Sequence, residues 1–175
     1  MFSGRKGVYG ILLSWAVVLA AVHGEAATPA PVKLAVFTFE LDDFSAAIST
    51  GGENPTDAAQ LDLVTEEVRK LLAQSGRYEL IAVESVDSAA AKTHTLRDCN
   101  GCDAPLALKL GAEQSFVGVV KRISRMEYQV RFQLRDARTG AVVAEGDTGL
   151  RMGAMDSWNR GALRLVKDRL LRNPA

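Results

Sequence analysis

The sequence predicts an α/β fold in which helices pack on a single mixed sheet. Three observations lead to this fold class: two strand patterns separated by an amphipathic helix pattern in the first half, three consecutive strand patterns in the second half, and a last amphipathic helix pattern near the C-terminus. A strand–helix–strand unit followed by an antiparallel three-strand meander and a C-terminal helix is typical of a mixed-sheet sandwich.

The first half of the chain supplies the strand–helix–strand unit. The run VKLAVFTFEL at 32–41 is apolar and rich in β-branched and aromatic residues, which predicts a buried strand. We expect a loop at 42–57 and then a helix at 58–76, capped by Thr56 or Asp57. Apolar residues at helical spacing predict its inner face: Leu61, Val64, Val68, Leu71 and Leu72.

Shorter elements follow this helix. The segment YELIAV at 78–83 predicts the second strand, and 84–95 has a weak helical pattern. The only two cysteines of the chain lie in the next loop, and 104–111 predicts a short helix that ends at Gly111.

Strand patterns at 114–124, 126–137 and 141–151 predict the antiparallel meander. In the middle run, apolar and polar residues alternate, which indicates a sheet with one buried and one solvated face. The buried set is Tyr128, Val130, Phe132 and Leu134, and the solvated set is Glu127, Gln129, Arg131, Gln133 and Arg135. The segment DARTG at 136–140 predicts a tight hairpin turn, because Gly140 can adopt positive φ.

The run MDSWNRGALRLVKDRLL at 155–171 predicts the C-terminal helix. Either Asp156 or Ser157 is expected to cap its first turn. The inner face is predicted to consist of Trp158, Ala162, Leu165, Val166 and Leu170.

The N-terminal segment 1–27 has the pattern of a secretory signal peptide. Arg5 and Lys6 precede an apolar run at 7–22, and small residues follow that run. The run is short for a membrane span, and an uncleaved anchor is the alternative interpretation. We therefore expect residues 28–175 to form one periplasmic α/β domain of a bacterial protein, with no stable membrane span after signal cleavage.

Composition and motifs argue against several classes of function. The chain has 21 basic and 21 acidic residues and no basic run, so nothing indicates a nucleic-acid partner. It contains neither a nucleophile-elbow serine nor a phosphate-binding glycine loop followed by lysine. We therefore expect a protein that is not an enzyme and that needs no cofactor.

Cys99 and Cys102 are separated only by an Asn-Gly pair. In an oxidising compartment we expect them to form a structural disulfide, for which the Asn-Gly pair supplies the turn. A redox-active dithiol is an alternative, since a thiolate near a helix N-terminus has a lowered pKa. The flanking carboxylates of Asp98 and Asp103 argue against it, because they repel a thiolate.

A metal site is a further alternative for this loop. Thiolate, imidazole and carboxylate groups that could bind zinc or copper(I) are present at His94, Asp98, Cys99, Cys102 and Asp103. His94 is the only histidine left after signal cleavage, and its polar surroundings are more typical of a solvated residue. Haem attachment is excluded because Asp103 occupies the position that requires histidine.

Three segments carry a resemblance to a known family: LRDCNGCDAPLALKLGAEQSFVGVVKRIS, RDARTGAVV and RMGAMDSWNRGALRLVKDRLL. Together they resemble an uncharacterised family of small secreted bacterial proteins with a Cys-Asn-Gly-Cys loop and a terminal Asp-x-Trp-x-Arg-Gly helix, over roughly 33–172. Where that family tends to have a polar Asn-Thr pair before the tryptophan, this chain has Ala154 and Met155. If that pair binds a ligand, the replacement bears on function.

A second, broader resemblance concerns the layout of the elements. The order of strands and turns is similar to that of the TolB amino-terminal domain, the CsgG-like domain and the penicillin-binding-protein activator modules. This resemblance implies a non-catalytic module that binds or assembles with another cell-envelope protein. A thiol-redox or metal-handling accessory protein that uses Cys99 and Cys102 is the alternative function.

The start of the last helix contains a candidate interaction patch. Trp and Arg are favoured in interface hot spots, so Arg151, Trp158 and Arg160 could form a docking surface for the partner. A buried Trp158 in the core and a capping role of Asp156 are the alternative interpretation. Gly153 and Gly161 are expected to allow close backbone approach at this junction.

Overall fold

The computed structural model describes residues 29–45, 55–83 and 95–172. In this part of the chain, strands in the order β3-β1-β4-β5-β6 form one sheet, with β2 beside β4 and β7 beside β5. The strands are β1 (Val32–Val36), β2 (Glu40–Asp43), β3 (Tyr78–Ile81), β4 (Gln114–Arg122), β5 (Glu127–Asp136), β6 (Val142–Asp147) and β7 (Arg151–Met152). The helices are α1 (Pro55–Gln74), α3 (Asp103–Lys109) and α4 (Trp158–Val166).

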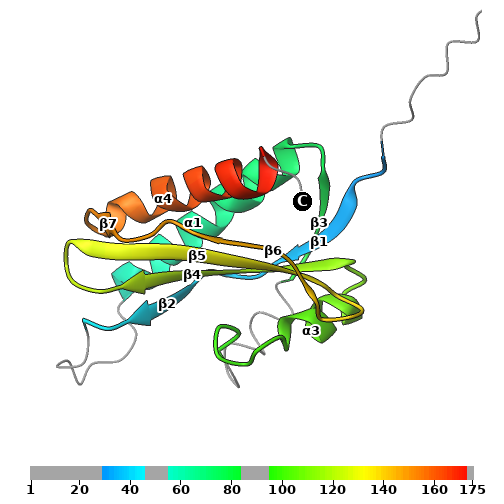
Figure 1. Cartoon of the computed structure of the whole chain (residues 1–175), viewed down its shortest axis with the longest axis horizontal. Helices are drawn as coiled ribbons and strands as arrows, with labels where there is room; N and C mark the ends of the chain where they lie inside the picture. The colour runs from blue at the N-terminus through cyan, green and yellow to red at the C-terminus, as the bar shows by residue number, and fades with distance from the viewer. Residues whose placement is uncertain (1–28, 46–54, 84–94, 173–175) are drawn as a thin grey trace, which may run out of the picture.

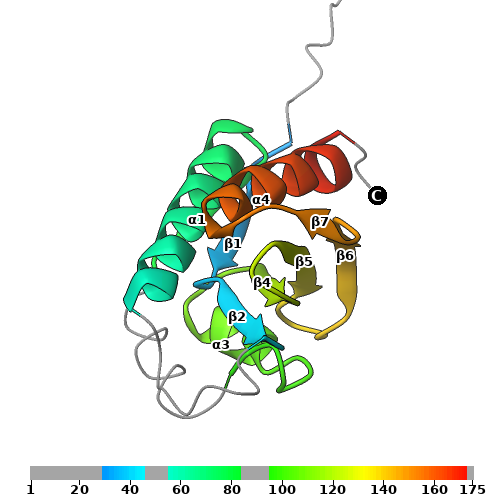
Figure 2. The ribbon, with the colours of Figure 1, turned by 90° about the vertical axis from the view of Figure 1, so that its left-hand side faces the viewer.

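The sheet is mixed, as the sequence predicts. Strand β1 lies parallel to both β3 and β4, whereas β4, β5 and β6 form the antiparallel meander. Helices α1 and α4 lie together on one face, and α3 lies on the opposite face (Figures 1 and 2). The predicted α/β sandwich with a strand–helix–strand unit, a meander and a C-terminal helix is therefore confirmed.

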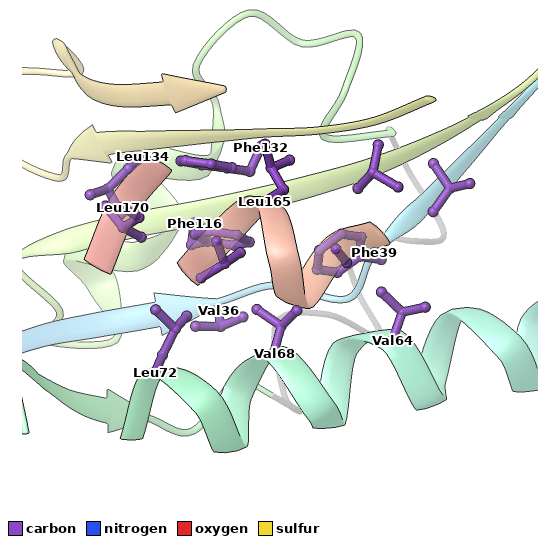
Figure 3. Packing of buried hydrophobic residues seen from close by; sticks show 14 of the residues in the cluster. Val36, Phe39, Val64, Val68, Leu72, Phe116, Phe132, Leu134, Leu165 and Leu170 are labelled. Atoms are coloured by element: carbon purple, nitrogen blue, oxygen red, sulfur yellow. The ribbon is translucent and has the colours of Figure 1, made fainter. Parts of the chain in front are cut away.

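Two hydrophobic clusters follow from this arrangement. The larger one lies between the sheet and helices α1 and α4, and Figure 3 shows its centre. Its labelled members are Val36, Phe39, Val64, Val68, Leu72, Phe116, Phe132, Leu134, Leu165 and Leu170. The smaller one packs α3 on the other face of the sheet and includes Ala35, Phe37, Ala107, Val117 and Val119. Consequently β1 and β4 are buried on both faces, as their continuous apolar sequences indicate.

The predicted strand at 32–41 is interrupted. Val36 pairs with Phe116 and Glu40 pairs with Val119. The stretch from β1 to β2 therefore contains one residue more than the stretch of β4 that it lies beside. Two backbone groups at the interruption bond to α1 instead. The amide of Phe39 donates to Thr65 Oγ1 at 2.9 Å, and Arg69 Nη2 donates to the carbonyl of Val36 at 2.7 Å.

The predicted cap of α1 is wrong, whereas Ser157 does precede α4 as its N-cap residue but without a side-chain capping bond. Helix α1 begins at Pro55, so Thr56 and Asp57 lie inside its first turn. At the last helix, Met155–Ser157 form a 3-10 turn, and Ser157 makes no capping hydrogen bond from its side chain. Its hydroxyl donates to the carbonyl of Ala154 instead, at 2.7 Å. The helical path then continues beyond α4 as a π-helical segment, Lys167–Leu171.

Other predicted boundaries shift by a few residues. The expected strand at 141–151 consists of β6 and the two-residue β7, with a register shift beside Leu134 and Arg135. Gly140 adopts the predicted positive φ, 72°, in the hairpin turn. The predicted weak helix at 84–95 and the signal segment 1–27 lie outside the described residues. Among the helices of the described ranges, none combines the length and apolar character needed to cross a membrane.

Candidate functional site

The cysteine loop lies next to α3. Cys99 and Cys102 are joined by a disulfide with their Cα atoms 5.6 Å apart. Between them, Asn100 and Gly101 have positive φ values of 49° and 110°. The amide of Cys102 also donates to the Cys99 sulfur at 3.2 Å. The Asn-Gly pair thus makes the reversal that so short a disulfide loop requires.

Arg135 at the end of β5 connects this loop to the sheet. A side chain at Gly101 would begin 3.7 Å from the Arg135 guanidinium, so the loop backbone lies directly on this group. Arg135 Nε lies 3.7 Å from the Asp103 carboxylate, and Nη1 donates to the carbonyl of Gly140 at 3.0 Å. Asp103 is 2% exposed and accepts the hydroxyl hydrogen of Ser115 at 2.5 Å. The disulfide loop, α3 and the hairpin turn are therefore held together by one buried polar network.

A groove of about 710 Å³ extends from this network along the face of β4 and β5 on which α3 packs, beside the solvated residues of β5. Its floor carries the alternating residues that the sequence places on the solvated face, Gln129, Arg131, Gln133 and Arg135. The other lining residues are Leu96, Arg97, Asp98, Asn100, Gly101, Asp103, Val117, Val119, Lys121, Phe132, Glu145, Gly146, Asp147 and Arg169. The groove thus lies between the disulfide loop and strand β6.

Hydrogen bonds orient the carboxylates that line the groove. Gln133 Nε2 donates to Glu145 at 3.2 Å, and Gln129 Nε2 donates to Asp147 at 3.1 Å. The backbone amide of Gly149 also donates to Asp147, at 2.7 Å. These two donors hold the pKa of Asp147 below its usual value, so this carboxylate stays charged.

A second hollow, of about 420 Å³, lies at the strand–helix junction beside the β4–β5 turn. Its lining residues are Ser45, Arg122, Ser124, Arg125, Glu127, Tyr128, Gly153, Ala154, Met155 and Trp158. The predicted close approach is present. A Cβ at Gly153 would lie 2.3 Å from Ser157 Oγ, and one at Gly161 would lie 3.1 Å from the Tyr128 ring. Ala154 and Met155 thus line a cavity.

The three residues of the predicted interaction patch are not equally accessible. Arg151 in β7 and Arg160 in α4 are exposed. Trp158 is 1% exposed and belongs to the main core cluster, as the alternative interpretation expects. Binding by Arg151 and Arg160 stays a prediction, but the indole of Trp158 contributes no accessible surface to a patch.

An ion-pair network behind the junction hollow was not predicted from the sequence. Arg122 at the end of β4 donates to both oxygens of Asp57, at 2.8 and 2.9 Å, and also to Asp43. Its guanidinium lies 5.8 Å from the centre of the Trp158 ring. Asp57 is 4% exposed, and the bond from Arg122 lowers the pKa of Asp43 to about 2. The network therefore joins β2, α1, β4 and α4.

Acidic residues near the first strand have structural partners as well. Glu40 accepts the backbone amides of Leu96 and Arg97, at 2.6 and 3.0 Å, and so holds the segment before the cysteines. No local pattern in the sequence indicates this pairing, because Leu96 follows Glu40 by 56 residues.

The metal-site alternative combined five residues of the cysteine region. His94 lies outside the described residues, and both cysteine sulfurs belong to the disulfide. Asp103 is engaged with Ser115 and Arg135, while Asp98 accepts the Thr95 hydroxyl hydrogen at 2.6 Å. Within 29–45, 55–83 and 95–172, no three His, Cys, Asp or Glu side chains are grouped so that they could hold a metal ion.

Solved structures similar to this chain come from several bacterial proteins. The LpoB C-terminal domain from Salmonella enterica is 20% identical with a TM-score of 0.47, covering 73% of this chain and 87% of that chain. LpoB from Escherichia coli is 15% identical with a TM-score of 0.49, covering 85% and 84%. Lipoprotein GNA1162 from Neisseria meningitidis is 13% identical with a TM-score of 0.48, covering 70% and 82%. At these levels we draw no functional conclusion from the likeness.

TolB is also among the similar solved structures, so the expected layout is not specific to TolB. TolB from Acinetobacter baumannii is 14% identical with a TM-score of 0.41, covering 75% of this chain and 26% of that chain. No curated protein sequence matches the chain. A family model described as "Protein of unknown function (DUF2380)" matches residues 32–170, which include both the cysteine loop and the tryptophan helix. The chain therefore belongs to this family, DUF3280.

Proposed function

We propose that the mature protein is a non-catalytic module of the bacterial cell envelope that binds another envelope protein in the polar groove. The observation that carries the proposal is the groove itself: a hollow on the face of the sheet on which α3 packs, bordered by a disulfide-closed loop whose position is fixed by Arg135. A surface that is ordered before binding loses less conformational entropy when the partner binds.

The signal peptide pattern supports an envelope location for this module. In this proposal residues 1–27 are removed and residues 28–175 act as one domain in the periplasm. The intact mass of the secreted protein tests this part directly. A mass equal to that of a chain that begins near residue 28 agrees with the proposal. A mass that includes the N-terminal segment would contradict it.

Site-specific photo-crosslinking in intact cells tests the binding function. Glu145 is exposed on β6 and lines the groove, so a benzophenone amino acid at this position faces a bound partner. Lys70 is exposed on α1, on the opposite face of the sheet, and serves as the control position. We expect a discrete envelope-protein adduct from position 145 only. No adduct there, or the same adduct from both positions, would refute the groove as the binding site.

A further inference from the structure

The charges that line the groove are not evenly matched. The carboxylates of Asp98, Asp103, Glu145 and Asp147 each accept hydrogen bonds from named donors. Arg131, in contrast, is exposed on the groove floor, and none of the described acidic side chains lies within salt-bridge distance of it. An arginine without a carboxylate partner is suited to bind one from a ligand, because its planar guanidinium matches carboxylate geometry.

Lys121 adds a second cation close to Arg131. In the antiparallel register Lys121 pairs with Gln129 and Val119 pairs with Arg131, so the two cations are diagonal neighbours on the same face. The ammonium of Lys121 lies 4.1 Å from the centre of the Phe44 ring, and none of the described carboxylates makes a salt bridge with it. The middle of the groove therefore carries two cations that make no salt bridge with a described carboxylate, although Asp147 pairs with Arg131 and Asp42 pairs with Lys121 in the strand register.

Apolar side chains flank these cations at both ends. Phe44, beside Lys121, is 55% exposed. At the other end Val142 is 43% exposed, and its pairing with Arg135 places it on the groove side of the sheet. From Gln129 to Arg135 the floor is about 20 Å long at the usual rise of a strand, which is the length of six or seven extended residues. Phe44 and Val142 do not line the groove themselves; they are exposed apolar side chains next to Lys121 and Arg135, which do line it.

We infer that the groove binds an extended acidic peptide segment of its partner, with carboxylates at Arg131 and Lys121 and apolar residues toward Phe44 and Val142. This inference rests on the proposed binding function and names the chemistry of the partner. A glycan fits less well, because the ring of Phe132, which lines the groove, is 3% exposed, and the exposed ring of Phe44 beside the groove is covered on one side by the Lys121 ammonium. Arg131→Gln removes the charge at the centre of the site.

Fluorescence anisotropy with synthetic probes tests the inference. The probes are a labelled octapeptide of alternating Glu and Val, the same peptide with Gln in place of Glu, and an anionic oligogalacturonate. We expect the Glu peptide to bind at least about fivefold more tightly than the Gln peptide, as one partly shielded ion pair would give. Arg131→Gln should remove this preference, whereas Lys70→Gln, on α1, should preserve it. Equal affinity for both peptides, or binding of the oligosaccharide alone, would overturn the inference.

The crosslinking adduct separates this inference from the function on which it rests. In an Arg131→Glu background, position 145 should capture its partner at least about fivefold less, and the captured segment should contain acidic residues. Capture that persists unchanged on a neutral segment overturns the acidic-peptide inference while the binding function stands. Failure to capture any partner in the unmodified background refutes the binding function and the inference together.

Discussion

Asp43→Asn is the sharpest test of the ion-pair network behind the strand–helix junction. Asp43 ends β2, and its carboxylate accepts a hydrogen bond from Arg122, which is also bound to Asp57. The Asp43 side chain is only 16% exposed, so solvent screens this interaction weakly. The substitution keeps the size of the side chain and removes its negative charge.

The expected magnitude follows from the pKa of Asp43. The hydrogen bond from Arg122, with a smaller contribution from Ser45, lowers this pKa from 3.8 to about 2. A lowering of this size corresponds to about 2 kcal/mol of unfolding free energy. Since the folded-state pKa lies below the unfolded value, the contribution is complete above about pH 5 and is lost as the pH falls through about 2, with about half remaining near pH 3.

Urea unfolding of the wild type and Asp43→Asn, measured between about pH 3 and pH 7, gives the difference in free energy. We expect a loss of about 2 kcal/mol at pH 7 that shrinks to about half near pH 3. Asp42→Asn, one position earlier in β2, is the matched control and should change stability by less than about 0.5 kcal/mol at either pH. A difference for Asp43→Asn that is the same at both pH values would show that the Arg122 bond does not control this carboxylate.

Three further predictions concern packing, the disulfide and the predicted patch. Gly118→Ala should cost about 2–3 kcal/mol, because the new Cβ would lie 2.3 Å from the Phe39 ring, and the cost should fall below about 1 kcal/mol in a Phe39→Ala background; equal costs would contradict this contact. Cys102→Ser should lower the free energy of unfolding by about 2 kcal/mol. Wild-type protein taken from the periplasm should resist thiol alkylation, and free thiols or a bound metal ion in mass spectrometry would exclude the structural disulfide. Trp158→Ala should cost about 3–5 kcal/mol because the side chain is buried, whereas Arg160→Ala should leave stability within about 0.5 kcal/mol. If the Arg160→Ala variant captures the partner as the wild type does, Arg160 is not part of the docking surface.

Strand β5 shows why part of the fold could be predicted. Its alternation of apolar and polar residues reports one buried and one solvated face, and the structure places Phe132 in the core and Arg131 in the groove accordingly. The first strand lacks such a signal because it is buried on both faces. An extra residue between Val36 and Glu40 therefore leaves no trace in an apolar run, although it decides that Phe39 packs over Gly118.

The candidate site was predictable only where its residues are neighbours in the sequence. The short spacing of Cys99 and Cys102 indicates a closed loop without knowledge of the fold. The position of that loop depends on Arg135, whose partners lie in α3 and in the hairpin turn. Local patterns also assign Asp57 to a cap, because they do not show that β4 brings Arg122 within 2.8 Å of it.

The two buried arginine networks lie at opposite ends of the β4–β5 hairpin. At one end Arg122 is bound to Asp57 in the first turn of α1, and at the other end Arg135 lies beside Asp103 in the first turn of α3. Replacing a whole buried ion pair by apolar residues can cost little, but a charge left without its partner is costly, so each pair fixes how its helix docks. Arg131 lies between them on the same hairpin and has no such partner among the described residues. The ends of the hairpin thus hold the helices in place, and its middle carries the exposed arginine that we propose binds the partner.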